Sequence, residues 1–132
     1  MRYLLILTGI LSGCVMQPPK ETFRYTSNST ALVMEELLVS QAEKCWTRNA
    51  RWEDGIKVSR EKNKVFASRF AGDTGIQKPF IIIEINESDK GSTVVVSEGD
   101  YACHLTGTCY SENYTASVKQ WINGNLACAK EN

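Results

Sequence analysis

His104 is the only histidine in the 132-residue chain, so the chemistry open to it sets a first limit on function. Metal motifs that need two histidines are excluded. A zinc site could be assembled only by combining this histidine with the cysteines Cys103, Cys109 and Cys128. Those thiols would then compete with disulfide formation in an oxidising compartment. We therefore predict neither a metal centre nor another cofactor.

Other residue types found in hydrolytic enzymes are present without their motifs. Ser97 and Ser111 lie outside any nucleophile elbow, so a triad with His104 and Asp100 has no sequence support. The glycine-containing segment 72–78 lacks the spacing and the hydroxyl of a phosphate-binding P-loop. Paired carboxylates can hydrolyse sugars, and the acidic residues on or after the predicted strands are Glu84, Glu87, Glu98 and Asp100. In a chain with 15 acidic residues, such near neighbours arise by chance. The sequence predicts a protein that is not an enzyme.

The N-terminal segment carries the most specific signal in the chain. Arg2 precedes an apolar run over residues 3–11, which is shorter than the about 20 residues of a membrane-spanning helix and typical of a signal peptide. The run ends in Leu11-Ser12-Gly13-Cys14, which resembles the lipobox of bacterial lipoproteins. The resemblance implies cleavage before Cys14, acylation of that cysteine with fatty acids such as palmitate, and attachment to a membrane. Val15 after the cysteine implies the outer membrane, with the domain in the periplasm.

Removal of residues 1–13 as a signal peptide leaves 119 of the 132 residues, enough for a single domain. Because Arg2 is lost, 14 basic residues then face 15 acidic ones. A nucleic-acid surface needs a strong positive bias, so nucleic acid is not an expected partner. No second long apolar run follows, and the lipid is the only membrane contact that we predict.

With Cys14 assigned to the lipid, an even number of cysteines remains: Cys45, Cys103, Cys109 and Cys128. In a small exported domain this predicts two disulfides, for which three pairings are possible. We favour Cys103 with Cys109 and Cys45 with Cys128, although spacing alone does not decide among the three. The second bridge would join the ends of two predicted helices and close the longer loop.

Two segments show helical periodicity. Residues 30–47 repeat apolar side chains on one face, at Met34, Leu38, Ala42, Cys45 and Trp46. This helix is expected to be capped by Ser27, Asn28 or Ser29. A second helix is predicted over residues 113–123, where Gly124 is placed to end it and one face carries Tyr114, Val118, Trp121 and Ile122.

Between the helices the hydrophobic period changes to two. Strands are predicted near residues 56–58, 65–70, 80–85 and 93–97, separated by turns at 61–64, 72–75 and 87–91. Short connections require antiparallel neighbours, since a parallel pair needs a long crossover. We therefore predict an α+β fold in the order α-β-β-β-β-α, with a four-stranded antiparallel meander whose apolar face lies under the helices. Residues 14–27, with Pro18-Pro19, are predicted as a lipidated flexible tether, and residues 28–132 as the domain.

Aromatic residues near the predicted loops suggest a contact surface. Tyrosine and tryptophan are favoured at protein interfaces, and the candidates here, with the single histidine, are Trp52, Tyr101, His104, Tyr110 and Tyr114. The leading hypothesis is a non-enzymatic accessory module that binds a protein of the cell envelope. The alternatives are a domain that binds a small molecule or glycan in a cleft, and an inhibitor or immunity lipoprotein against an envelope hydrolase.

Overall fold

A computed structural model describes residues 18–47, 55–70, 76–100, 102–103, 109–110 and 113–129. Along these residues the chain forms β1 (Lys20–Ser27), α1 (Ala31–Trp46), β2 (Gly55–Glu61), β3 (Lys64–Phe70), β4 (Ile76–Ser88), β5 (Gly91–Glu98), β6 (Ala102–Cys103), β7 (Cys109–Tyr110) and α2 (Tyr114–Ile122). Strands β2 to β5 are sequential antiparallel neighbours, as predicted. The fold is α+β, with two helices and a five-stranded antiparallel sheet in the order β1-β5-β4-β3-β2.

The fifth strand corrects two predictions. Lys20–Ser27 forms β1, so this part of the predicted tether belongs to the sheet and the domain begins before residue 28. β1 pairs antiparallel with β5, from Lys20 opposite Glu98 to Ser27 opposite Ser92. As an edge strand it exposes most of its side chains, and its sequence therefore lacks the strong buried alternation of a central strand such as β5.

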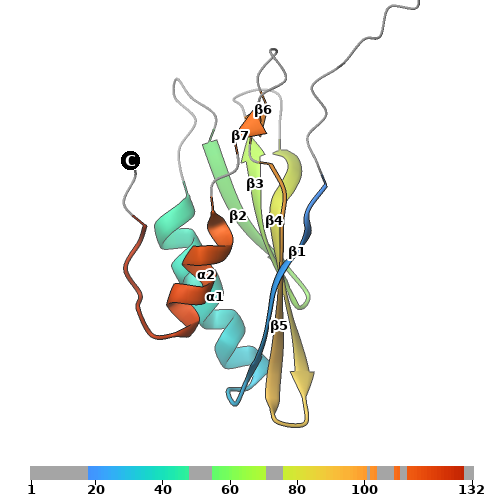
Figure 1. Cartoon of the computed structure of the whole chain (residues 1–132), viewed down its shortest axis with the longest axis vertical. Coiled ribbons are helices and arrows are strands. Elements are labelled where there is room, and N and C mark those ends of the chain that lie inside the picture. Colours follow the sequence, from blue (N-terminus) through green and yellow to red (C-terminus); the bar gives the residue numbers. More distant parts are fainter. Residues whose placement is uncertain are drawn as a thin grey trace, which may run out of the picture.

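Both helices cover the same face of the sheet (Figure 1). α1 packs mainly on β2, β3, β4 and β5, whereas α2 packs mainly on β5 and α1. Alternate side chains of the central strands point to this covered face and are buried, for example Val65, Ile83 and Val96. They meet the helical residues at the predicted four-residue spacing, Met34, Leu38, Ala42 and Trp46, all of which are buried. This confirms the predicted core.

The helix ends are fixed by side-chain caps. Thr30 caps α1 by accepting a hydrogen bond from the Val33 N–H at 3.4 Å, so the predicted caps at Ser27, Asn28 or Ser29 are wrong by at least one residue. α2 ends at Ile122, and Gly124, predicted to end the helix, follows its C-cap Asn123 with a φ of +87°. Such a positive φ suits glycine because glycine has no Cβ. Neither described helix combines the length and the apolar character needed to cross a bilayer.

The turn between β4 and β5 packs against the segment that joins β1 to α1. Gly91 has φ +136°, and a Cβ at this position would collide with backbone atoms of Ser27 and Ser29. The next residue, Ser92, donates its hydroxyl to the Ser29 carbonyl at 2.8 Å. This contact holds the start of α1 against the lower end of the sheet in Figure 1.

A disulfide joins Cys45, near the end of α1, to Cys128 beyond α2, with 5.2 Å between the Cα atoms. This confirms the predicted long-range pairing. The chain-entropy model assigns a bridge over a loop of this size, with a sequence separation of 83, about 4.5 kcal/mol of stability. The same C-terminal segment is held by hydrogen bonds to the Ala127 carbonyl from Gln120 Nε2 at 2.9 Å and Trp121 Nε1 at 3.3 Å.

The other two cysteines lie in the small antiparallel ladder formed by β6 and β7. Cys103 is directly opposite Cys109 in its register. Backbone opposition is the arrangement that the predicted Cys103–Cys109 disulfide needs, because the Cα separation within antiparallel pairs overlaps the range of disulfide bonds. The bridge itself stays a prediction.

Candidate functional site

The predicted aromatic surface is only partly described. Trp52, Tyr101 and His104 lie outside the described residues, and Tyr110 is described only as a residue of β7. Tyr114 is buried, with 4% of its surface exposed, and its assignment to an exposed contact surface is corrected. It occupies the first turn of α2, which points towards the sheet, and so packs into the core instead.

The surroundings of Tyr114 explain its burial. Its ring meets Trp46 of α1 edge-on, with 5.2 Å between ring centres, and lies 4.9 Å from the ring of Phe80 in β4. Trp121 completes the cluster at 4.9 Å from Trp46. These aromatic residues join α1, α2 and the sheet, which is a packing role rather than a binding role.

A polar surface hollow of about 650 Å³ lies beside the start of α2. It is formed where β1 begins and β5 ends, and its lining includes Lys20, Thr22, Glu98, Asp100, Thr115 and Lys119. The hollow gathers two ammonium groups and two carboxylates in one place. This mixture of charges makes the hollow a candidate catalytic or ligand site.

Glu98 is the central group of this hollow and is already engaged. Its carboxylate accepts hydrogen bonds from the N–H of Tyr114 at 3.0 Å and of Thr115 at 2.8 Å, and from the Thr115 hydroxyl. Bonds from the first N–H groups of a helix to a carboxylate satisfy donors that have no partner within the helix. Asn113 satisfies a further donor by accepting from the Ala116 N–H at 3.1 Å.

A short hydrogen-bond chain continues from Glu98 to β1. The hydroxyl oxygens of Thr22 and Thr115 are 2.7 Å apart, and Thr22 Oγ1 lies 3.3 Å from the Val96 carbonyl. An ionised carboxylate only accepts, so Thr115 donates to Glu98, and Thr22 donates its single proton to Thr115 or to Val96. The chain of hydrogen bonds ties β1, β5 and α2 together.

One of the two ammonium groups that line the hollow lies over an aromatic ring. Lys119 extends from α2 over the ring of Phe23 in β1, with its ammonium nitrogen 4.9 Å from the ring centre. A cation over an aromatic face at this distance is worth about 0.5 to 1 kcal/mol at an exposed site. In the described part of the chain, no group of three His, Cys, Asp or Glu residues is placed to hold a metal ion.

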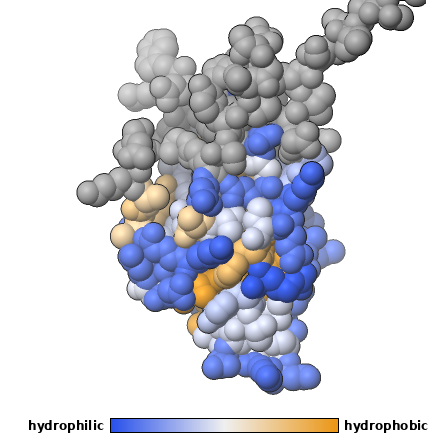
Figure 2. Space-filling view, in the orientation of Figure 1, coloured by the Kyte–Doolittle hydropathy of each residue, from blue (hydrophilic) through white to orange (hydrophobic). Residues whose placement is uncertain are grey.

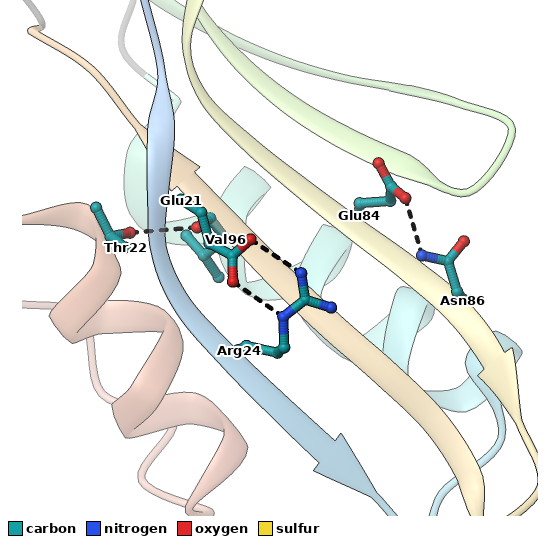
Figure 3. Close-up of polar contacts among 6 residues, drawn as sticks. All are labelled: Glu21, Thr22, Arg24, Glu84, Asn86 and Val96. Carbon is teal, nitrogen blue, oxygen red and sulfur yellow. Dashed lines mark hydrogen bonds and ion pairs between the residues drawn. The ribbon is translucent and has the colours of Figure 1, made fainter.

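The face of the sheet away from the helices carries a second set of charges (Figure 3). On β1, Arg24 forms two hydrogen bonds of 2.9 Å to Glu21, and these lower the pKa of the Glu21 carboxyl. On β4, Glu84 accepts from Asn86 at 2.9 Å, and Lys64 of β3 lies 3.6 Å from it. The Asn86 bond, with smaller effects of Lys64 and Arg24, lowers the pKa of Glu84. These exposed pairs stabilise the surface weakly.

The space between the sheet and the helices is filled. The sixteen buried apolar residues of the described core are each at most 5% exposed. The largest of those with almost no exposed surface, Trp121, Phe80 and Leu38, lie between the two layers. An apolar binding cleft would need unfilled volume at this interface. The packing of the described residues therefore speaks against the predicted cleft.

The residues of β1 are the part of the molecule that sequence reasoning missed. The run Thr22-Phe23-Arg24-Tyr25-Thr26 is rich in threonine and aromatic residues, which favour strands. That composition was the available signal. It was outweighed by the two preceding prolines and by the absence of a strongly apolar face.

No family model, curated protein or solved structure matches this chain. A functional proposal must therefore rest on its own sequence and geometry.

Proposed function

We propose that this chain is a lipoprotein of the bacterial outer membrane, anchored through fatty acids on Cys14, whose domain binds another protein of the envelope and is not an enzyme. The observation that carries the proposal is the sequence Leu11-Ser12-Gly13-Cys14 at the end of a short apolar run. Several acyl chains on one cysteine hold a protein durably at a membrane, because stable anchoring needs more than one chain.

The cysteines support an exported location. The Cys45–Cys128 bridge closes a loop with a sequence separation of 83, and disulfides persist in oxidising compartments such as the periplasm. Cys103 and Cys109, opposed in the β6–β7 ladder, form the second disulfide of the proposal. Together the bridges compensate for the modest core of a small domain.

The interior supports a binding module rather than an enzyme or a ligand carrier. The core between sheet and helices is filled, and the carboxylate of Glu98, the central group of the polar hollow, is occupied as a helix cap. A partner would therefore bind to the surface of the described domain, not inside it.

The anchor also sets the orientation of the domain. Five residues separate Cys14 from Lys20, the first residue of β1, and the stretch from Cys14 to Lys20 spans at most about 20 Å when extended. β1 begins at the end of the sheet that carries β6 and β7, and the β4–β5 turn lies at the opposite end (Figure 1). The β6–β7 end then faces the membrane, and the β4–β5 end points away from it.

Substitution of the anchoring cysteine tests the proposal directly. We expect Cys14→Ala to abolish incorporation of a labelled palmitate analogue and to move the protein out of the membrane fraction, because the acceptor thiol is lost. The matched control is Ser12→Ala, which keeps a small residue before the cysteine and should leave both readouts unchanged. Labelling that persists in Cys14→Ala, or wild-type protein that retains Met1 and carries no acyl chain, would contradict the anchor.

Recovery of a partner tests the second half of the proposal. The lipidated wild-type protein, extracted from membranes in mild detergent, should bring down one envelope protein in stoichiometric amount. The Cys14→Ala variant should recover much less of it, since it no longer reaches the same membrane. Repeated recovery of the lipidated protein alone would contradict the binding role while leaving the anchor intact.

A further inference from the structure

The free edge of β1 presents unpaired backbone groups to solvent. The Gly99 N–H donates to the Phe80 carbonyl at 2.7 Å, so odd-numbered residues of β5 bond to β4 and even-numbered ones bond to β1, as an antiparallel ladder requires. The register places Val94 opposite Tyr25. It follows that odd-numbered residues of β1 bond to β5, whereas Arg24 and Thr26 direct their N–H and C=O groups outwards.

Only part of this edge is regular. The register of β1 against β5 shifts between Glu21 and Phe23, and an irregularity of this kind discourages pairing next to it. Beyond the shift, pairing is continuous as far as Ser27. The usable edge is therefore the stretch from Phe23 to Ser27, in which Arg24 and Thr26 are exposed.

An apolar surface borders this edge on the helix-covered side. Phe23 and Tyr25 are opposite the buried Val96 and Val94, so their rings lie on the covered side, where they stack with 6.2 Å between centres. Tyr25 remains 36% exposed. Figure 2 shows an apolar area in the middle of this face with hydrophilic residues around it.

The two helices contribute the rest of this surface. On α2, Lys119 reaches Phe23, and the partly buried Ile122 follows three residues later on the same flank. On α1, Glu35 pairs with Arg60 of β2 at 3.4 Å, so the flank of α1 that carries Glu35 faces β2. The opposite flank, towards β1, carries the 56% exposed Val33 and the partly buried Leu37. We call these residues together the apolar surface beside β1: Phe23, Tyr25, Val33, Leu37 and Ile122.

The described segments next to β1 and α2 are not placed to cover this edge. Pro18 and Pro19, directly before β1, lack the N–H that a strand needs. The described residues after α2 lie on the side of the helices away from β1 (Figure 1), where Cys128 is bridged to Cys45 of α1. Unpaired backbone groups beside an apolar surface and the Lys119 ammonium suit an extended segment of another protein.

A second copy of the chain is a poorer occupant of this edge. Because both copies would carry the proposed anchor, two copies in one membrane stand the same way up and their β1 strands run in the same direction. Such strands can pair only as a parallel ladder, which is slightly less stable per residue than an antiparallel one, and antiparallel pairing would place the two anchors on opposite sides. The membrane is no better occupant, because the stretch from Phe23 to Ser27 runs away from the anchored end (Figure 1).

We propose that the edge of β1 from Phe23 to Ser27 binds an extended segment of another envelope protein, which adds to the sheet as a sixth strand. Backbone groups of Arg24 and Thr26 supply the hydrogen bonds, and alternate apolar side chains of the segment rest on the apolar surface beside β1. This is recognition by strand addition, in which the ladder gives affinity and the side-chain contacts give specificity. A carboxylate of the segment meets Lys119, for which no ion pair is seen among the described residues.

The test uses the full-length lipidated protein in living cells, with a photo-crosslinking amino acid in place of Arg24. The backbone contribution is isolated by Thr26→Pro, which removes an outward N–H but no hydrogen bond to β5, and by its matched control Thr26→Ala, which keeps that N–H. We expect Thr26→Pro to lower the yield of the adduct by about tenfold, the effect of roughly 1.4 kcal/mol, and Thr26→Ala to leave it unchanged.

A second pair of variants tests the apolar surface without touching the strand. Val33→Glu places a charge on the flank of α1 opposite to Glu35, whereas Leu32→Glu, at a 63% exposed neighbour, places the same charge about 100° away around the helix axis. We expect loss of the adduct in the first and retention in the second. Equal unfolding midpoints for all four variants show that none of them acts by unfolding the domain.

The adduct itself decides the nature of the occupant. Mass spectrometry of the crosslinked peptide should identify a segment of a different protein with alternating apolar residues. A synthetic peptide of that segment, added to the isotope-labelled domain, should protect the amides of Arg24 and Thr26 from exchange. An adduct with a second copy, an adduct with lipid, or yields equal in Thr26→Pro and Thr26→Ala would overturn strand addition. If Cys14 carries no lipid, the proposed function fails instead, whatever the adduct shows.

Discussion

The two edges of the sheet differ in what lies over them. At the β2 edge, α1 packs directly on the strand, so that Ile56 is fully buried and Arg60 is held by Glu35 of the helix. At the β1 edge, Phe23 is only partly buried and Tyr25 is 36% exposed. Edge strands are usually protected by cover or charge. The comparison indicates that side chains of one edge strand are packed into the core under α1, whereas those of the other edge strand remain largely accessible.

The largest expected effect comes from releasing the helix that packs on β2. Replacing both Cys45 and Cys128 by alanine removes the bridge between α1 and the C-terminal segment. We expect a loss of about 4 kcal/mol in the free energy of unfolding, because the unfolded chain is no longer cross-linked. Urea unfolding measures the loss, and amide exchange should rise more in β2 than in β1. A change below about 1 kcal/mol would contradict this role of the bridge.

The next effect compares the two edges residue by residue. Ile56→Ala leaves a cavity under α1, and we expect a loss of about 3 kcal/mol. Tyr25→Ala at the exposed edge should cost less than about 1 kcal/mol, since a partly exposed side chain loses less buried area. Both are measured by urea unfolding at neutral pH. Equal losses would show that the β1 edge is packed as firmly as the β2 edge.

A smaller effect should arise where β1 is tied to α2. Glu98→Ala removes the acceptor for the N–H groups of Tyr114 and Thr115, and we expect a loss of about 1 to 2 kcal/mol. Asp100→Ala, a neighbouring acid that also lines the polar hollow, is the control and should change stability little. Amide exchange at the first turn of α2 locates the effect, and unchanged exchange there would contradict the capping role.

The smallest expected effect lies on the face of the sheet away from the helices, between the two edge strands. The pKa of Glu84 is lowered, chiefly by the hydrogen bond from Asn86. Its contribution to stability is therefore present above the ordinary pKa of about 4.5 and is lost as the pH falls through the lowered value. Because the side chain is 39% exposed, we expect no more than about 0.5 kcal/mol.

Glu84→Gln should therefore reduce the difference in unfolding free energy between pH 7 and pH 3 slightly. Glu87→Gln, exposed on the same strand, is the comparison variant. A larger change for Glu87→Gln than for Glu84→Gln would argue against the assigned hydrogen bond.

Much of the fold was open to prediction because it follows from local patterns with a buried face. The four-residue spacing from Met34 to Trp46 gave α1, and the alternation in β3 to β5, with short turns between, gave the meander. Gly124 ended α2 for a local conformational reason. The candidate site was less predictable. Tyr114 was assigned to the surface, yet the first turn of α2 directs it into the core.

By itself, the sequence determined the helices, the antiparallel meander, the cysteines available for bridging and the lipobox-like segment, because each depends on residues close together in the chain. Only the tertiary structure decided that Lys20–Ser27 is a strand, and that Cys45 meets Cys128. An edge strand has a single neighbour, here β5, which lies far away in the sequence. Its few buried side chains leave too weak a pattern, so the strand is recognised only once the sheet that it joins has formed.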